Sequence, residues 1–264
     1  RRGGFQDSVE YIQRSWIGTI TPVYVLLVLG PDRIFSNYLH PTLNEVHILQ
    51  QPLLPVNQYE SILPPVILLL QQVPLAMDKH QEDDYVDFYT ERNLPEMLSR
   101  EGPKIAHGDV NGDGLEDVYI GGAKGQAGQL YLQIPTGTFI KKEEPVFKTY
   151  AVFEDVAVLF FDADKDGDLD LFIGAGGNNA EPNTLEIQHR LYINDGKGNF
   201  TIDGRAFANN NMNIAVVVAN DFDGDGDLDL FVGSRSVPYN YGITPQSYLY
   251  VNDGHGHFTD MALT

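Results

Sequence analysis

The stretch DFDGDGDLDLFVG, residues 221–233, places an aspartate at every second position from Asp221 to Asp229 and then continues into apolar residues. Read as a strand, this alternation would put five carboxylates on one face, where directly stacked like charges are destabilising. The stretch therefore predicts a loop in which something offsets the repulsion, followed by a strand.

This stretch is one of three copies of a repeat. DVNGDGLEDVYIGG from Asp109 and DADKDGDLDLFIGA from Asp162 align with it without a gap. A second box follows each copy: LYLQIPTGTF (130–139), LYINDGKGNF (191–200) and LYVNDGHGHF (249–258). Apolar runs precede the second and third acidic loops, and Asn-Asp-Gly signals a hairpin in the second and third boxes.

Each repeat is thus expected to form a four-stranded antiparallel meander, the strand count of one propeller blade. The fold class is all-β, with three blades in a partial propeller. Because propellers typically have about 4–8 blades, either the N-terminal region supplies degenerate blades or the three form an arc of a longer protein. Further blades of the parent chain or of a neighbouring subunit are therefore expected partners.

The acidic loops have the spacing of a cation site. Side chains at positions 1, 3, 5 and 9 can converge if the chain turns sharply at the glycine of position 6, and position 7 would offer its main-chain carbonyl. Such oxygen ligands suit Ca²⁺, so up to three structural calcium ions are expected. The candidate ligands are Asp109, Asn111, Asp113, Leu115 and Asp117; Asp162, Asp164, Asp166, Asp168 and Asp170; and Asp221, Asp223, Asp225, Asp227 and Asp229.

Two details refine this prediction. A helix-loop-helix calcium site would need an acidic residue at position 12, where this chain has Ile120, Ile173 and Val232. The first loop has Asn111 in place of an aspartate and is expected to bind most weakly. The side chains of Asp168 and Asp227 are expected to be solvated or to contact the ligands of the ion, and not to bind the ion directly.

Composition excludes several other classes of protein. The chain has 264 residues, no cysteine and a net charge of −20. A disulfide framework and a thiolate metal site are therefore impossible, and nucleic acid is an improbable partner for so acidic a surface. No apolar run reaches the ~18 residues that a membrane span requires, so no membrane insertion is expected.

The region before the repeats differs in kind. Residues 1–79 are rich in Pro, Leu and Gln and are interpreted as a small β region with a Pro-rich linker. Residues 80–103 form a connecting segment, in which the spacing of Leu94, Met97 and Leu98 predicts a short helix over 92–99. The blades occupy 104–264.

The repeated units resemble the FG-GAP or VCBS repeats of integrin α-chain propellers and of large secreted bacterial proteins. The resemblance covers residues 103–264. GFQDSV (4–9) looks like the start of the ASPIC/UnbV segment found with such repeats in cartilage-acidic-protein-like chains, and residues 80–133 are similar to bacterial members that join the two. The resemblance implies a calcium-stabilised, secreted or cell-surface propeller used for binding or adhesion.

Strand order places the acidic loop and the hairpin at one end of each blade and the insert between the second and third strands at the other. The metal would then be structural, and a glycan or protein ligand would meet the inserts, 174–190 and 233–248. Tyrosines interleaved with polar residues suit such contacts. The candidate ligand-binding residues are Arg235, Tyr239, Asn240, Tyr241 and Tyr248.

Two other functions stay open. A propeller-based lyase or hydrolase of polysaccharides would need two unligated carboxylates, for which the inserts offer only Glu181 and Glu186. No catalytic residue is therefore assigned, and the chain is not expected to be an enzyme. A purely structural spacer is the other alternative.

Overall fold

The computed structural model describes residues 76–182 and 184–262, together with two strands nearer the N-terminus. The chain divides into two units, Arg1–Gln72 and Val73–Thr264. In the first unit, β1 (Val25–Leu29) pairs antiparallel with β2 (Phe35–Leu39). The expected ASPIC/UnbV segment at 4–9 lies outside the described residues.

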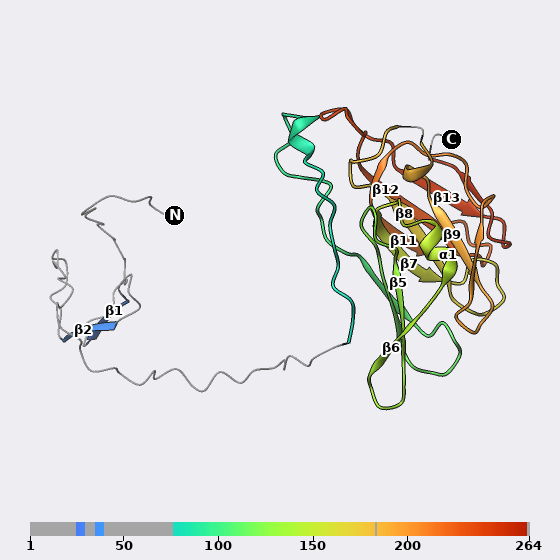
Figure 1. The fold of residues 1–264 in the computed structure, drawn as a ribbon, viewed down its shortest axis with the longest axis horizontal. Helices are drawn as coiled ribbons and strands as arrows, with labels where there is room; N and C mark the ends of the chain where they lie inside the picture. Colours follow the sequence, from blue (N-terminus) through green and yellow to red (C-terminus); the bar gives the residue numbers. More distant parts are fainter. Residues whose placement is uncertain (1–24, 30–34, 40–75, 183, 263–264) are drawn as a thin grey trace. The chain divides into compact units, whose positions relative to one another are not determined.

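The second unit contains three four-stranded antiparallel sheets, and in each the strands follow the order of the sequence (Figure 1). Blade 1 consists of β3 (Ile105–Gly108), β4 (Asp117–Ile120), β5 (Gln129–Gln133) and β6 (Phe139–Lys142). Blade 2 consists of β7 (Asp155–Phe161), β8 (Asp170–Ala175), β9 (Arg190–Asn194) and β10 (Phe200–Asp203). Blade 3 consists of β11 (Asn213–Asn220), β12 (Asp229–Ser236), β13 (Tyr248–Asn252) and β14 (Phe258–Asp260).

The all-β prediction is confirmed, and the sheets have the form of partial propeller blades. Each acidic loop joins the first two strands of its blade, and its last aspartate begins the second strand, as in the pairing of Phe161 with Asp170. The Asn-Asp-Gly hairpins join the last two strands of blades 2 and 3, as their turn chemistry predicts.

Aromatic and aliphatic side chains between neighbouring blades form the core. Between blades 1 and 2, a short helix, α1 (Pro145–Thr149), inserts Phe147. The Phe147 ring packs edge-on against Tyr119 of blade 1 and Tyr192 of blade 2, with ring centroids 5.2 Å apart in both pairs. Between blades 2 and 3, the core includes Phe172 and Tyr250. Adjacent blades are therefore held together by buried apolar surface.

The helix predicted over 92–99 is wrong. These residues form turns and bends, and a single 3₁₀ turn, η1 (Asp87–Tyr89), precedes them; another, η2 (Leu185–Ile187), lies in the blade 2 insert. Pro95 disfavours helical geometry at Leu94. Leu94 and Leu98 are nevertheless buried, so the apolar spacing corresponds to burial in a segment without a helix. In the described part of the chain, no helix is long and apolar enough to cross a membrane.

Candidate metal sites and the insert end of the blades

The three acidic loops fold in the same way. In each, the two oxygens of the position 1 aspartate accept hydrogen bonds from the backbone N–H groups of positions 4 and 6. In loop 1, Asp109 accepts from Gly112 at 2.8 Å and from Gly114 at 2.7 Å. The corresponding bonds of Asp162 and Asp221 repeat this geometry. The loop therefore closes around its first carboxylate.

Positive φ angles make this closure possible. The position 6 glycines, Gly114, Gly167 and Gly226, have φ of +82°, +92° and +90°, as the sequence predicts. Position 4 is also left-handed, and in loop 2 it is occupied by Lys165 with φ of +65°. A non-glycine residue in this conformation is uncommon, so a specific contact of its side chain is expected.

Two loops bring three carboxylates together. In loop 2 the oxygens of Asp162, Asp164 and Asp166 lie within 4.8 Å of one another, and Asp221, Asp223 and Asp225 do the same in loop 3. In loop 1, Asn111 donates to Asp113 at 3.2 Å and only two carboxylates are present at these positions. The loops thus supply the oxygen ligands that a hard divalent cation prefers.

The carboxylates of loop 2 lie close to one another, and the ammonium of Lys165 in the same loop pairs with Asp227 of loop 3. Burial, followed by the negative charge of Asp166, raises the pKa of Asp164. The same two causes raise the pKa of Asp168 to about 6. Oδ1 of Asp168 is buried and accepts no hydrogen bond from any described residue. An orphaned carboxylate oxygen beside three others fits a bound cation, which would restore the ionised forms.

Position 9 has a different role from positions 1, 3 and 5. Asp170 is fully buried, and its two oxygens accept hydrogen bonds from the backbone N–H groups of Ala163 and Asn194 at 2.9 and 2.8 Å. Asp117 and Asp229 make the equivalent pairs of bonds in their own blades. Burial raises the pKa of Asp170 to about 7, although these N–H donors oppose the rise. This aspartate joins its loop to the third strand of the blade.

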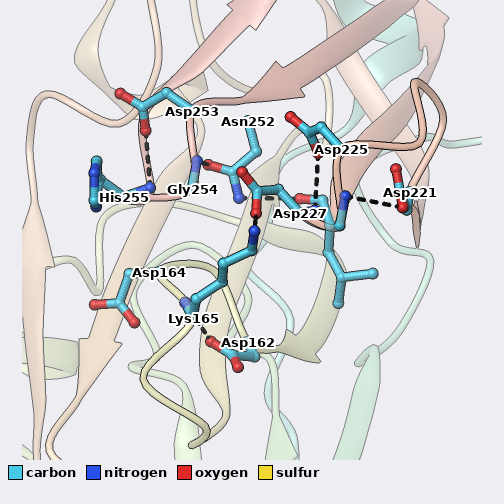
Figure 2. Close-up of polar contacts among 12 residues, drawn as sticks. Asp162, Asp164, Lys165, Asp221, Asp225, Asp227, Asn252, Asp253, Gly254 and His255 are labelled. Atoms are coloured by element: carbon cyan, nitrogen blue, oxygen red, sulfur yellow. Dashed lines mark hydrogen bonds and ion pairs between the residues drawn. The ribbon is translucent and has the colours of Figure 1, made fainter.

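Position 7 aspartates contact neighbouring parts of the structure. Asp227 is buried and forms an ion pair with Lys165 of loop 2, so its side chain is not solvated (Figure 2). The side chains of Asp168 and Asp227 each lie against the first glycine of a hairpin, Gly196 and Gly254. A Cβ atom at either glycine would come within 2.6 Å of the carboxylate. For Leu115, the main-chain carbonyl stays a predicted ligand.

The hairpins lie at the same end of the blades as the acidic loops, as expected. Asn194 donates from Nδ2 to the Leu169 carbonyl in loop 2 of its own blade, and Asn252 donates in the same way to Leu228. From the sequence, these asparagines were expected only as turn residues. Their repetition in the two boxes was the available signal for a further contact.

The insert end is largely occupied by the connecting segment. Asn178 of the blade 2 insert donates to Asp87 at 3.0 Å and to Glu91 at 2.7 Å, and Asn179 donates to Asp83. In blade 3, the Tyr241 backbone N–H donates to Glu91. In Figure 1 the connecting segment, in teal, reaches the red loop that follows β12. The two inserts are therefore not open loops along their whole length.

This arrangement changes the set of candidate ligand-binding residues. Tyr248 is buried and stacks on Tyr250 with ring centroids 5.3 Å apart, so its ring is not presented at the surface of the insert end. Arg235 pairs with Glu96 at 2.6 Å and with Glu101, at the edge of a hollow of about 340 Å³. Burial and the Tyr85 hydroxyl raise the pKa of Tyr239 to about 12.

Asn240 and Tyr241 keep exposed side chains. Other large apolar side chains exposed at this end come from the inserts and from the connecting segment: Tyr89, Leu185 and Ile243. The connecting segment thus adds to this surface, which the sequence analysis did not anticipate.

Comparison with known proteins supports the repeat assignment. Residues 109–173 and 177–232 match the profile of the FG-GAP-like repeat family, covering the first two blades and the start of the third. No curated protein matches the chain significantly.

Proposed function

We propose, taking the FG-GAP-like repeats of residues 109–232 as the premise, that this chain is a calcium-stabilised binding or adhesion module of the secreted or cell-surface class. The observation that supports calcium is the repeated carboxylate triad. Asp162, Asp164 and Asp166 gather their oxygens within 4.8 Å. Their negative charges act on Asp168, whose Oδ1 is buried without a hydrogen-bond partner among the described residues. The ion would neutralise these carboxylates and supply no chemistry on a substrate.

The binding surface is proposed at the insert end. The exposed residues there are Tyr89 of the connecting segment and Asn240, Tyr241 and Ile243 of the blade 3 insert. A hydrogen bond from the Tyr241 backbone to Glu91 joins the insert to the connecting segment. Rigid aromatic side chains beside polar groups suit contacts with sugar rings or with an amphipathic protein surface. Since the acidic loops lie at the other end, the metal would act through the rigidity of the scaffold.

Chelation tests the metal part of this proposal. Adding EDTA to the calcium-loaded chain should lower the free energy of unfolding, by about 2.7 kcal/mol for each site held at 100 times its dissociation constant. Calorimetry of the wild-type chain with calcium, with magnesium and with EDTA measures the change. Identical melting curves in all three would refute calcium stabilisation.

A glycan array with the wild-type chain and Tyr241→Ala tests the binding part, and an extracellular-protein array covers protein ligands. Loss of a specific signal in the variant, with an unchanged melting curve, supports the insert end. Ile105→Ala, at an exposed blade 1 residue, is the matched control. A reducing-sugar release assay on the array hits would detect a polysaccharide-degrading activity instead.

A further inference from the structure

The acidic loops of neighbouring blades are linked through the hairpins. Asn194, in the hairpin of blade 2, donates from Nδ2 to the Val110 carbonyl of loop 1 at 2.8 Å. Asn252, in the hairpin of blade 3, donates to the Ala163 carbonyl of loop 2 at the same distance. Val110 and Ala163 both occupy position 2 of their loops. Each hairpin therefore contacts both the loop of its own blade and the loop of the blade before it.

This arrangement brings position 4 of one loop close to position 7 of the next. At the first interface, a Cβ atom on Gly112, position 4 of loop 1, would lie 3.7 Å from the carbonyl oxygen of Gly196, which itself lies against the Asp168 carboxylate. At the second interface, Lys165 at position 4 of loop 2 pairs with Asp227 at position 7 of loop 3 (Figure 2). The two interfaces thus place the same positions near each other, but only the second has a side chain at position 4.

The backbone of Lys165 contacts loop 2, whereas its ammonium contacts loop 3. The Lys165 N–H donates to Asp162 at 2.8 Å, and Nζ pairs with Asp227. A Cβ atom on Gly226 would lie 3.7 Å from the same Nζ. Gly226 directly follows Asp225, a member of the carboxylate triad of loop 3. A positive charge from loop 2 therefore lies beside the candidate cation site of loop 3.

The backbone conformation of Lys165 distinguishes this contact from an ordinary surface ion pair. Position 4 is glycine in the other two loops, Gly112 with φ of +75° and Gly224 with φ of +82°, and Lys165 adopts φ of +65°. A side chain in this left-handed region has a conformational cost that glycine avoids. Its partner Asp227 is buried, so solvent ions screen the pair less than an exposed one. The pair is therefore a specific feature of the second interface.

We propose that Lys165 is an internal counter-ion that lowers the calcium affinity of loop 3, so that loops 2 and 3 fill at different calcium concentrations. This inference rests on the proposed binding of calcium by the loops. An ammonium repels a divalent cation, and it also neutralises Asp227, whose negative charge would otherwise favour the ion. Loop 2 is preceded by Gly112, which brings no charge to Asp168, so loop 2 fills first.

The order of filling matters for the insert of blade 3. The strand β12 begins at Asp229 of loop 3 and runs to Ser236, within the insert that carries Asn240 and Tyr241. At low calcium, loop 2 is occupied and Lys165 pairs with Asp227. At higher calcium, the ion in loop 3 displaces the ammonium and stabilises the strand that leads into the insert. Binding at this insert is then strengthened in the upper part of the calcium range.

Calcium titration of chains with one intact loop tests the proposal. Asp113→Asn together with Asp164→Asn leaves loop 3 with its three carboxylates. In this background, Lys165→Gly supplies the glycine that the other two loops have at position 4. Isothermal titration at low ionic strength should give a dissociation constant about fivefold lower for K165G than for the same chain with Lys165. The difference should shrink at high salt, because the ammonium is partly exposed.

Two further variants separate the charge of Lys165 from its backbone. Lys165→Gln removes the charge without the freedom of glycine and should tighten calcium binding as K165G does. Lys165→Arg keeps the charge and should keep the original dissociation constant. The reciprocal change is made in loop 1: with Asp113→Asn and Asp223→Asn leaving loop 2 intact, Gly112→Lys should weaken calcium binding by about threefold, and Gly112→Gln is its uncharged control.

Equal or weaker calcium binding by K165G and K165Q would overturn the proposal while leaving calcium binding by the loops established. Binding by K165R as tight as that by K165G would also overturn it, because the effect would not follow the charge. If none of the chains binds calcium, the proposed calcium function fails and this inference fails with it. Melting curves in EDTA verify that each variant is folded, and if G112K is not, the three substitutions of Lys165 decide.

Discussion

The two ends of the blades differ in whether their polar contacts repeat from blade to blade. At the loop end, the same hydrogen bonds recur in all three blades, as in the backbone bonds to Asp109, Asp162 and Asp221. At the insert end, each contact occurs once: Arg190 pairs with Asp155 at 2.5 Å, and Asn178 reaches Asp87. Repeated sequence therefore determines one end, and contacts between distant segments determine the other.

One buried carboxylate at the insert end and the carboxylates of loop 2 differ in their partners. The buried Asp155 accepts hydrogen bonds from Arg190, from the Tyr119 hydroxyl and from the Gly122 backbone N–H. The carboxylates of loop 2 repel one another, and the pKa of Asp168 rises to about 6 through burial and the charge of Asp166. Variants at the two ends should thus respond differently to calcium and to pH.

The largest effect is expected at the insert end. Asp155→Ala leaves the buried Arg190 guanidinium without its partner, and the free energy of unfolding should fall by about 3–5 kcal/mol. Urea unfolding of the variant in calcium measures this loss. Glu143→Gln, which removes the exposed pair with Lys148, is the control and should change stability little. Similar losses in both variants would contradict the comparison.

A smaller effect is expected from Asp170, the position 9 aspartate of loop 2. Asp170→Ala leaves two buried backbone N–H groups without an acceptor and should destabilise the chain by about 2–3 kcal/mol, equally in calcium and in EDTA. Asp164→Ala is the paired variant, because it should lose the part of the calcium response that loop 2 contributes while changing the stability in EDTA little. The proposed division of roles fails if Asp170→Ala is harmful only when calcium is present.

Stability should also depend on the ionisation of Glu154 at the insert end. Burial, then the negative charges of Glu82 and Asp83, raises its pKa from 4.5 to about 8, although an Asn179 side-chain amide opposes the rise. As pH rises from 4.5 to 8, the unfolded chain releases the Glu154 proton before the folded chain does. The contribution of protonated Glu154 to the free energy of unfolding is therefore complete below pH 4.5 and is lost as pH rises to 8.

Glu154→Gln should therefore stabilise the chain at pH 8.5 by on the order of 2 kcal/mol relative to its effect at pH 4.5. Chemical unfolding at both pH values, in EDTA so that the loops do not contribute a calcium response, measures the difference. A variant with the same effect at both pH values would show that Glu154 keeps its ordinary pKa.

The smallest effect is expected in loop 1. Asn111→Asp restores the third carboxylate and should tighten calcium binding at that loop by about fivefold, because ligand charge tunes affinity. Asp164→Asn makes the reverse change in loop 2. Isothermal titration of both variants and of the wild-type chain tests the order of the sites, and tighter binding by loop 1 in the wild-type chain would disprove it.

The sequence predicted most of the loop end because local rules act there. The glycines at position 6, the hairpins of blades 2 and 3 and a second strand after the acidic loop were all readable from the repeat. The burial of Tyr248 was not predicted, because its surroundings come from distant parts of the chain, and the helix over 92–99 was wrong because Pro95 outweighs the apolar spacing. Tyr248 lies against His189, which is far away in sequence, and Leu94 is buried without any helix.

The hydrogen bond from a hairpin asparagine to the acidic loop of the preceding blade also bears on the order in which the blades can fold. Asn194 follows the Val110 that it binds by 84 residues, and Asn252 follows Ala163 by 89. During synthesis, a blade leaves the ribosome well before the residues that complete it. Because closing such distant contacts is slow, the last blade made on a growing chain exposes the apolar side that faces the next blade. That side stays exposed until the next blade has been synthesised and has folded.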